Sequence, residues 1–448
     1  MKQKLKYTEY IAISSMLFGL FFGAGNLIFP AQMGQLAGAN MWSAAAGFIV
    51  TGVGLPLLAI IGMGMSRSNG LLEMGNRVSK GYSLLFTICL YLTIGPFFAI
   101  PRTATVSFSV GLEPLLGEGG TAIWLAVFSV CFFAIVLFFS LNPTGILTWV
   151  GKILNPMFLA VLAILIITAL THPLGSVTTV VPESAYHTGS FFTGLMEGYN
   201  TMDVLAALAF GIVVINVLRR KGIEEPGQVA ADMVKSGFFS MLLMAVIYIS
   251  IIVVGAQSRG VLPVCNNGGE VLALVAREYF GPVGQILLAI MITLACLKTA
   301  IGLVTSISET FVSLTSGKII YSWWAIGFSL VSFLIANLGL NKIVAYSIPV
   351  LMLLYPLAIT LILLSIFGKC FGYSREVFQS VTILTFMAAV FDFMKALPEG
   401  ARNILHVNGL VDFAVDRLPL FNIGLGWIVP AVIGAVIGLL WRKMVSST

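Results

Sequence analysis

Residues 21–30 read FFGAGNLIFP and lie in the middle of an apolar run that extends from Tyr10 to about Leu36. This run exceeds the about 20 helical residues that cross a hydrocarbon core of about 30 Å. A helix that faces lipid should not carry two glycines and an asparagine at its centre, because each backbone group without a partner there costs several kcal/mol. We interpret the segment as a break whose free N–H and C=O groups face an ion or a zwitterion. Glycine is also common in membrane helices as a packing residue, and that alternative stays open.

The composition indicates an all-α polytopic membrane protein. Of the 448 residues, 58% are hydrophobic and only 9% are charged. The net charge of +6 would suggest nucleic acid as a partner of a soluble protein, but here it is expected from basic residues in cytoplasmic loops. The five cysteines show no C-x-x-C spacing and the three histidines lie in predicted loops, so we expect no metal site, cofactor or enzyme chemistry.

Twelve apolar runs are long enough to span a membrane. With a cytoplasmic N-terminus, 16 basic residues fall in inside loops and six in outside loops, which supports this count and places both termini in the cytoplasm. A helical piece is predicted over residues 270–279, in the long loop at 256–282, where it could lie across the external mouth. The predicted spans are residues 10–36, 42–65, 82–111, 121–141, 146–171, 190–218, 236–257, 283–313, 321–340, 343–367, 376–397 and 424–441.

The sixth run, like the first, contains a polar, glycine-containing break, since residues 195–203 read LMEGYNTMD. Runs one and six therefore begin two five-run halves, and because five is odd the second half enters from the opposite side. This inverted repeat brings discontinuous helices together near the bilayer midplane. We expect one transport domain over residues 1–448, divided into a first repeat at 1–172, a second repeat at 188–368 and two additional C-terminal helices at 376–448.

Several motifs resemble the branched-chain amino acid:cation symporter family, which comprises bacterial carriers of leucine, isoleucine and valine. The resemblance implies a LeuT-like fold with five plus five inverted segments and two extra helices, sodium coupling, and a place in the bacterial cytoplasmic membrane. Its expected partners are a small amino acid, a monovalent cation and the lipid bilayer, and a monomer is expected to suffice. The motifs are FGAGNLIFP at 22–30, GP at 95–96, PRTATVSF at 101–108, GYNTMD at 198–203 and NLGL at 337–340.

The same resemblance implies a sodium site between runs one and eight. Oxygen ligands at a helix distortion suit a hard cation. Ser308 is an alternative to Ser306, and the hydroxyls otherwise bond only the carbonyl four residues earlier in their own helix. The implied ligands are the carbonyls of Gly19, Phe22 and Gly302 and the hydroxyls of Thr305 and Ser306.

A substrate site is expected at the two breaks themselves. The backbone N–H groups of Ala24 and Gly25 are predicted to bind the substrate carboxylate, because they lie at a half-helix N-terminus. Asn26 either helps to hold a second sodium ion or forms a hydrogen bond between helices. Backbone carbonyls at Gly23, Tyr199, Asn200 and Thr201 are predicted to bind the substrate amine.

Three charged residues lie at membrane depth, where an ionisable group is by default a functional hypothesis. Asp203 either stabilises the cation or substrate ammonium, or caps the second half-helix. Arg102 either faces an external vestibule or, as we favour, pairs with Glu113 or Glu118.

Lys298 lies two turns before Thr305 on the same face of run eight, and a lysine there departs from the family's usual pattern. We hypothesise that it replaces or modulates one cation and makes transport partly dependent on protons. The alternative is a pair with Asp203, Glu309 or another buried acid.

The sequence therefore predicts a secondary active symporter that carries branched-chain amino acids with sodium by alternating access, H⁺ remaining possible as coupling ion. The alternative is a proton- or sodium-coupled carrier of another small neutral solute. An ion channel is a remote alternative, because no repeated pore lining or carbonyl filter is visible.

Overall fold

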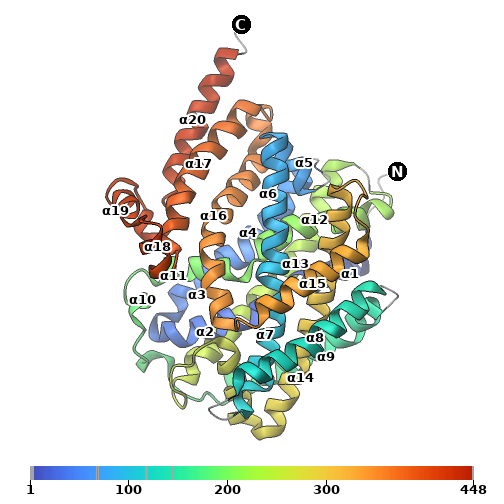
Figure 1. Ribbon diagram of the computed structural model, residues 1–448, viewed down its shortest axis with the longest axis vertical. Coiled ribbons are helices and arrows are strands. Elements are labelled where there is room, and N and C mark those ends of the chain that lie inside the picture. Colours follow the sequence, from blue (N-terminus) through green and yellow to red (C-terminus); the bar gives the residue numbers. More distant parts are fainter. Residues whose placement is uncertain are drawn as a thin grey trace.

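The computed structural model describes residues 5–66, 68, 70–116, 120–142, 146–223 and 225–445. Every regular element in these ranges is helical, and no strand occurs among them (Figure 1). Eight of the helical stretches in the described part of the chain are long and apolar enough to cross a membrane. Some predicted spans fall short of this measure because a break divides them into shorter helices.

The first predicted span is divided at residues 22–24. Helix α1 (Tyr7–Phe21) ends where Phe22 adopts an extended conformation with φ −74° and ψ 105°, and α2 (Gly25–Ala37) begins three residues later. The predicted break is thus confirmed, although Asn26 already belongs to the first turn of α2. Glycine allows the chain to change direction here without a side chain in the way.

The sixth predicted span is divided as well. Helix α11 (Ser190–Glu197) continues into a 3₁₀ turn, η6 (Gly198–Thr201), and α12 (Asp203–Arg220) follows. Between them, Met202 has φ 62° and ψ 15°, a left-handed conformation that is strained for a bulky side chain. Strain of this kind persists only where surrounding structure enforces it, which makes the second break a fixed feature of the fold.

The other helices complete a bundle around these two broken segments. In Figure 1, α20 runs beside α17 and projects beyond the remaining helices. The shorter helices are α5 (Leu71–Asn76), α10 (Ser184–His187), α18 (Glu399–Ile404) and α19 (Asn408–Arg417). The longer ones are α3 (Met41–Ile49), α4 (Leu55–Met65), α6 (Lys80–Leu92), α7 (Ala99–Gly111), α8 (Thr121–Leu141), α9 (Ile146–Thr171), α13 (Pro226–Ser258), α14 (Gly268–Leu314), α15 (Tyr321–Ala336), α16 (Leu340–Phe367), α17 (Arg375–Ala396) and α20 (Ile428–Val445).

Helix α14 consists of two helices joined by a kink. Gly281 has φ 64° and ψ −164°, and Pro282 follows it. Proline disfavours helical conformation in the residue before it and removes one hydrogen bond, so the kink follows from this dipeptide. The part before the kink contains residues 270–279, which confirms the predicted helical piece in the long loop.

Glycines allow α2 to pack very closely on α13. A Cβ atom added to Gly34 would lie 2.0 Å from the carbonyl oxygen of Ile252, and one added to Gly255 would lie 2.2 Å from that of Ala31. Helices α3 and α11 are joined in the same way by Gly47 and Gly194. Small residues bring backbones together in membrane helices, where apolar burial alone does not drive association.

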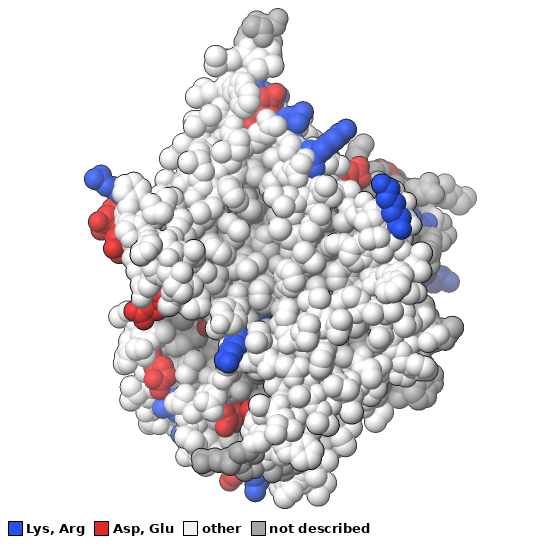
Figure 2. Space-filling view, in the orientation of Figure 1, with Lys and Arg blue, Asp and Glu red and all other residues white. Residues whose placement is uncertain are grey.

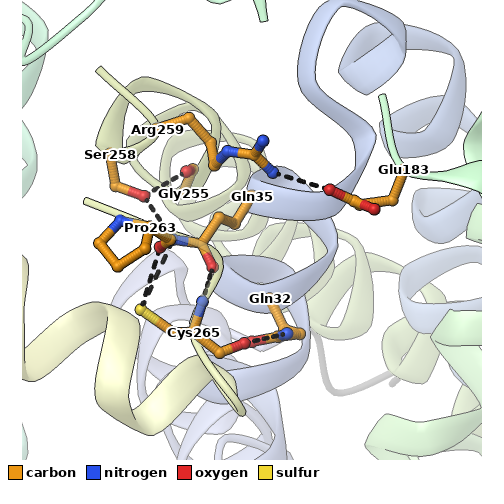
Figure 3. Close-up of polar contacts among 8 residues, drawn as sticks. All are labelled: Gln32, Gln35, Glu183, Gly255, Ser258, Arg259, Pro263 and Cys265. Atoms are coloured by element: carbon orange, nitrogen blue, oxygen red, sulfur yellow. Dashed lines mark hydrogen bonds and ion pairs between the residues drawn. The ribbon is translucent and has the colours of Figure 1, made fainter. Parts of the chain in front are cut away.

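The far end of α2 is fixed by amide side chains, as Figure 3 shows. The Gln35 side chain donates to Ser258 Oγ and to the Pro263 carbonyl, both at 3.1 Å, and its Oε1 accepts from the Cys265 N–H at 2.8 Å. Gln32 donates to the Cys265 carbonyl at 3.1 Å. These bonds attach α2 to the end of α13 and to the loop before α14.

The molecular surface carries few charges. Figure 2 shows a broad uncharged area, with most Lys, Arg, Asp and Glu side chains towards its margins. Helix α8 exposes 70% of Ile123 and 61% of Phe138 while burying Phe132 and Val136. An apolar exposed face together with a packed inner face is expected where lipid is the solvent.

Candidate functional site

The two breaks meet through a buried polar cluster. Asn26 Nδ2 donates to both carboxylate oxygens of Asp203 at 2.9 Å, and the Tyr248 hydroxyl of α13 donates to Oδ2 at 2.6 Å. The Asn26 amide also donates to the Tyr248 oxygen. All three side chains are at least 98% buried. Buried polar groups that satisfy one another hold a unique geometry, so this cluster fixes α2 against α12.

The cluster settles one alternative for Asp203. Met202, and not Asp203, occupies the N-cap position of α12, and the Asp203 N–H at the start of that helix donates to the Thr201 hydroxyl at 3.4 Å. The Asp203 carboxylate instead points across to Asn26. The capping alternative is therefore wrong, because the side chain leaves its own helix to bond the other broken segment.

Backbone donors remain available at the first break. The Gly23 N–H donates to Asn26 Oδ1 at 2.7 Å, but no hydrogen bond between described residues uses the N–H groups of Ala24 or Gly25. These groups lie at the N-terminal end of α2, where the helix dipole is positive. The position predicted for the substrate carboxylate thus carries two free donors.

A cavity of about 50 Å³ lies at this junction, and we call it the central cavity. Six of the predicted residues line it, namely Gly23, Ala24, Gly25, Asn26, Thr201 and Asp203. The other lining residues are Phe21, Ile94, Ala99, Arg102, Thr103, Met202, Ala206, Phe210, Thr299 and Leu303.

Two predicted substrate residues do not line the central cavity. Tyr199 is stacked on Tyr355 with ring centroids 4.0 Å apart and is 1% exposed. The Asn200 carbonyl accepts a hydrogen bond from Arg102 Nη1 at 2.6 Å, so it is already occupied. The 3₁₀ turn directs both residues away from the cavity, and their sequence position alone did not indicate this.

Arg102 is a site residue for which the sequence favoured a structural pair. Glu113 accepts from Ser109 rather than from Arg102, so that predicted pair is wrong, and Glu118 lies outside the described residues. Arg102 Nη2 donates to Ser347 Oγ at 3.1 Å, and the guanidinium lies 4.9 Å from the Phe29 ring centroid. The guanidinium therefore reaches from α7 to the residues around both breaks.

The predicted sodium site contains an amine. Lys298 Nζ lies 3.4 Å from the Gly19 carbonyl oxygen and donates to it. Neither Asp203 nor Glu309, both described in the structure, forms an ion pair with Lys298. The predicted pairs with these two acids are wrong, because the side chain extends towards the end of α1 instead.

Two hydroxyl groups of α14 lie near the predicted sodium site in the sequence and lack hydrogen-bond partners among the described residues. Those of Thr305 and Ser308 are buried and have no hydrogen-bond partner in the described part of the chain. The alternative that Thr305 bonds the carbonyl four residues earlier is therefore wrong. A Cβ atom added to Gly302 would meet nothing within 4 Å, so space lies beside that residue. Phe22 stacks on Phe18, with ring centroids 4.8 Å apart.

Sequence reasoning missed Tyr248, Thr299 and Leu303 as contributors to the junction. Each lies within a long apolar run and shows no motif of its own. A tyrosine in an apolar run usually finds a polar partner when it is buried, which is the only signal that pointed to Tyr248.

Solved structures of other transporters share this fold. The transporter Mhp1 of the nucleobase-cation-symport-1 family, closed with bromovinylhydantoin bound, matches with a TM-score of 0.61 at 14% identity, over 98% of this chain and 92% of that one. MhsT in complex with L-phenylalanine matches with a TM-score of 0.56 at 14% identity, over 99% of each chain. At these identities the likeness concerns the LeuT-like fold alone.

Several curated proteins are much more similar in sequence than these solved structures. The branched-chain amino acid permease BrnQ of Lactobacillus delbrueckii subsp. lactis is 52% identical over 97% of this chain and 96% of its own length. BrnQ of Bacillus subtilis is 42% identical over 98% of each chain, and the branched-chain amino acid transport system 2 carrier protein of Pseudomonas aeruginosa is 37% identical over 99% of this chain and 98% of its own.

A family model also covers almost the entire chain. The model described as branched-chain amino acid transport protein matches residues 6–445. The family, the apolar helices and the fold together indicate a multi-pass membrane carrier rather than an enzyme. The chain belongs to the branched-chain amino acid transport protein family.

Proposed function

We propose that the protein is a secondary active transporter that carries leucine, isoleucine and valine into the cell in symport with sodium. The observation that carries the proposal is the contact between Asn26 and Asp203, beside the free N–H groups of Ala24 and Gly25. This arrangement offers one anionic side chain and a cluster of backbone donors within a single cavity. Both ends of a zwitterion can be bound there.

The proposed architecture has twelve spans in a five plus five inverted repeat, with both termini in the cytoplasm of a bacterium. Packing supports the repeat: α1 and α2 of span one contact α13 of span seven, while α11 and α12 of span six contact α3 and α4 of span two. In an inverted repeat, the first span of each half corresponds to the first span of the other, so contact of span one with span seven is matched by contact of span six with span two. A single chain contains both breaks, and we propose that a monomer suffices.

The substrate is proposed to lie along the first turn of α2. Its carboxylate would bind the N–H groups of Ala24 and Gly25, and its ammonium would lie towards Asp203 and the Gly23 carbonyl. The central cavity of about 50 Å³ has room for only a few waters, at about 10–15 Å³ each. Binding of leucine therefore requires the bundle to move, as alternating access requires.

Two cation positions are proposed. Asn26 and Asp203 would bind one sodium ion beside the substrate. The carbonyls of Gly19, Phe22 and Gly302 with the hydroxyls of Thr305 and Ser306 would form the other, where the Lys298 ammonium now bonds the Gly19 carbonyl. Lys298 would thus replace or modulate one cation, so that a proton contributes to coupling.

Uptake of labelled leucine into proteoliposomes tests the proposal. We expect a sodium gradient to drive accumulation, with isoleucine and valine competing and glycine, proline and serine failing to compete. Accumulation of a different neutral solute would support the alternative carrier. Equally fast uptake without any gradient of sodium or protons would contradict secondary active transport.

A further inference from the structure

We propose that Arg102 binds the carboxylate of the substrate, together with the free backbone N–H groups of α2. This inference rests on the proposed function and adds a specificity-determining residue to it. The guanidinium belongs to α7, outside both broken segments, and no sequence motif assigned it a role in substrate binding.

Geometry places the guanidinium at the carboxylate position. A Cβ atom added to Gly25 would lie 3.6 Å from Arg102 Nη1, so the arginine directly faces the first turn of α2. Arg102 also lines the central cavity with Ala24 and Gly25. A carboxylate bound to the N–H groups of these two residues therefore lies within reach of the guanidinium.

The charge of Arg102 lacks an anionic partner among the described residues. The side chain is 2% exposed, and its two hydrogen bonds go to the Asn200 carbonyl and the Ser347 hydroxyl, both neutral. Its Nε is buried without a hydrogen-bond partner in the part of the chain that the structure describes. Burying an ionised group without a counter-charge is costly, and at membrane depth such groups are usually functional. A substrate carboxylate supplies the missing charge and matches the planar fork of donors.

The central cavity is also lined by an acidic residue. Asp203 lines the same cavity and is the acid of the cluster that joins the two breaks. A cavity lined by a buried guanidinium and a buried carboxyl group is complementary to the carboxylate and ammonium of an α-amino acid. This pairing favours amino acids over amines or neutral solutes of the same shape.

Arg102 also contacts two residues that line a second cavity. A second cavity of about 280 Å³ is lined by Phe29 and Asn200, both of which the guanidinium contacts. The same side chain therefore lines the central cavity and contacts two residues of the second one.

The test compares leucine with leucinol, which keeps the amine and side chain but lacks the carboxylate. Equilibrium binding of both is measured on purified protein, using the unaltered chain, Arg102→Gln and Arg102→Lys. A hydrogen bond to a charged group contributes about 1.5–3 kcal/mol, so Arg102→Gln should weaken leucine binding about 10- to 150-fold. The affinity for leucinol should change less than about threefold in Arg102→Gln. The leucine affinity of Arg102→Lys should lie between those of the unaltered chain and Arg102→Gln, because lysine keeps the charge but lacks the planar pair of donors of the guanidinium.

A second variant does not depend on the arginine. Gly25→Ala places a methyl group at ordinary contact distance from Phe29 and Arg102, so the fold should tolerate it while the carboxylate position is filled. We expect leucine binding to be lost and thermal unfolding to be unchanged. Gly327→Ala, where an added Cβ meets nothing within 4 Å, is the matched control.

The outcomes distinguish a failure of the inference about Arg102 from a failure of the proposed function. If the unaltered protein binds leucine and Arg102→Gln weakens leucine and leucinol by the same factor, Arg102 has only a structural role and the inference is overturned. If the unaltered protein binds none of leucine, isoleucine and valine, the proposed function is wrong and this inference falls with it. A selective loss for leucine supports both.

Discussion

Asn26 and Asp203, 177 residues apart in the chain, join the two interrupted helices through two hydrogen bonds of 2.9 Å. Each residue lies in the first turn of the half-helix that follows its break. The contact therefore brings two helix N-termini to one place and sets a buried carboxylate between them. Positive helix ends favour a carboxylate at this position.

Asp203→Asn should reduce sodium-dependent leucine uptake at least about 10-fold, since a hydrogen bond to a charged group contributes about 1.5–3 kcal/mol. The amide removes the negative charge and turns one acceptor into a donor opposite the Asn26 amide. Uptake into proteoliposomes at equal protein density measures the effect. The exposed Asp412→Asn is the control and should transport at the parental rate; equal rates for both variants would exclude a role for the Asp203 charge.

Lys298→Thr should change the coupling of transport. Without the ammonium at the Gly19 carbonyl, that position becomes available to sodium only, so uptake should depend less on pH and more steeply on sodium concentration. Initial uptake rates over a matrix of pH and sodium measure both. Lys342→Thr, an exposed lysine at the start of α16, should behave as the parent. The hypothesis fails when Lys298→Thr retains the parental dependence on both ions.

Gly34→Ala should lower the stability of the bundle by about 1–3 kcal/mol, the usual effect of overpacking. The added Cβ would lie 2.0 Å from the Ile252 carbonyl oxygen, so α2 and α13 must move apart. Thermal unfolding in detergent measures the loss, with Gly327→Ala as the matched control that should unfold like the parent. An unchanged unfolding temperature for Gly34→Ala would show that the two helices pack less closely.

Gln35→Ala should destabilise the attachment of α2 to the loop before α14. It removes the hydrogen bonds of a fully buried side chain to Ser258, to Pro263 and to the N–H and Sγ of Cys265, and a typical intramolecular hydrogen bond contributes about 0.5–1.5 kcal/mol. Amide hydrogen exchange at residues 264–267 should increase more than exchange in α17, which the network does not touch. Equal protection in variant and parent would mean that the loop is held by other contacts.

Both breaks could be predicted from the sequence, because glycines and polar residues in the middle of a membrane-length apolar run disfavour a continuous helix that faces lipid. Part of the lining of the central cavity could be predicted as well, since Gly23 to Gly25 form the break itself. The direction in which residues of a break point was harder to predict. Tyr199 and Asn200 lie in the second break, yet the 3₁₀ turn and the left-handed Met202 direct them away from the central cavity.

Contacts between distant segments could not be read from the chain. Arg102 was favoured as a partner of nearby acids because sequence proximity was the only guide, whereas its side chain reaches Asn200 and Ser347. Lys298 and Thr305 both belong to α14, but the reach of Lys298 to the Gly19 carbonyl depends on how closely α14 approaches α1. Tyr248 entered the cluster through the packing of α13, which no local pattern indicates.

Leucine binding to the purified protein, measured at equilibrium while sodium replaces potassium at constant ionic strength, tests the shared site most directly. The dissociation constant of leucine should fall at least about tenfold as sodium rises, and leucine should raise sodium affinity by the same factor, because coupling between two ligands is reciprocal. A dissociation constant for leucine that is identical in sodium and potassium would contradict a site in which amino acid and sodium bind together.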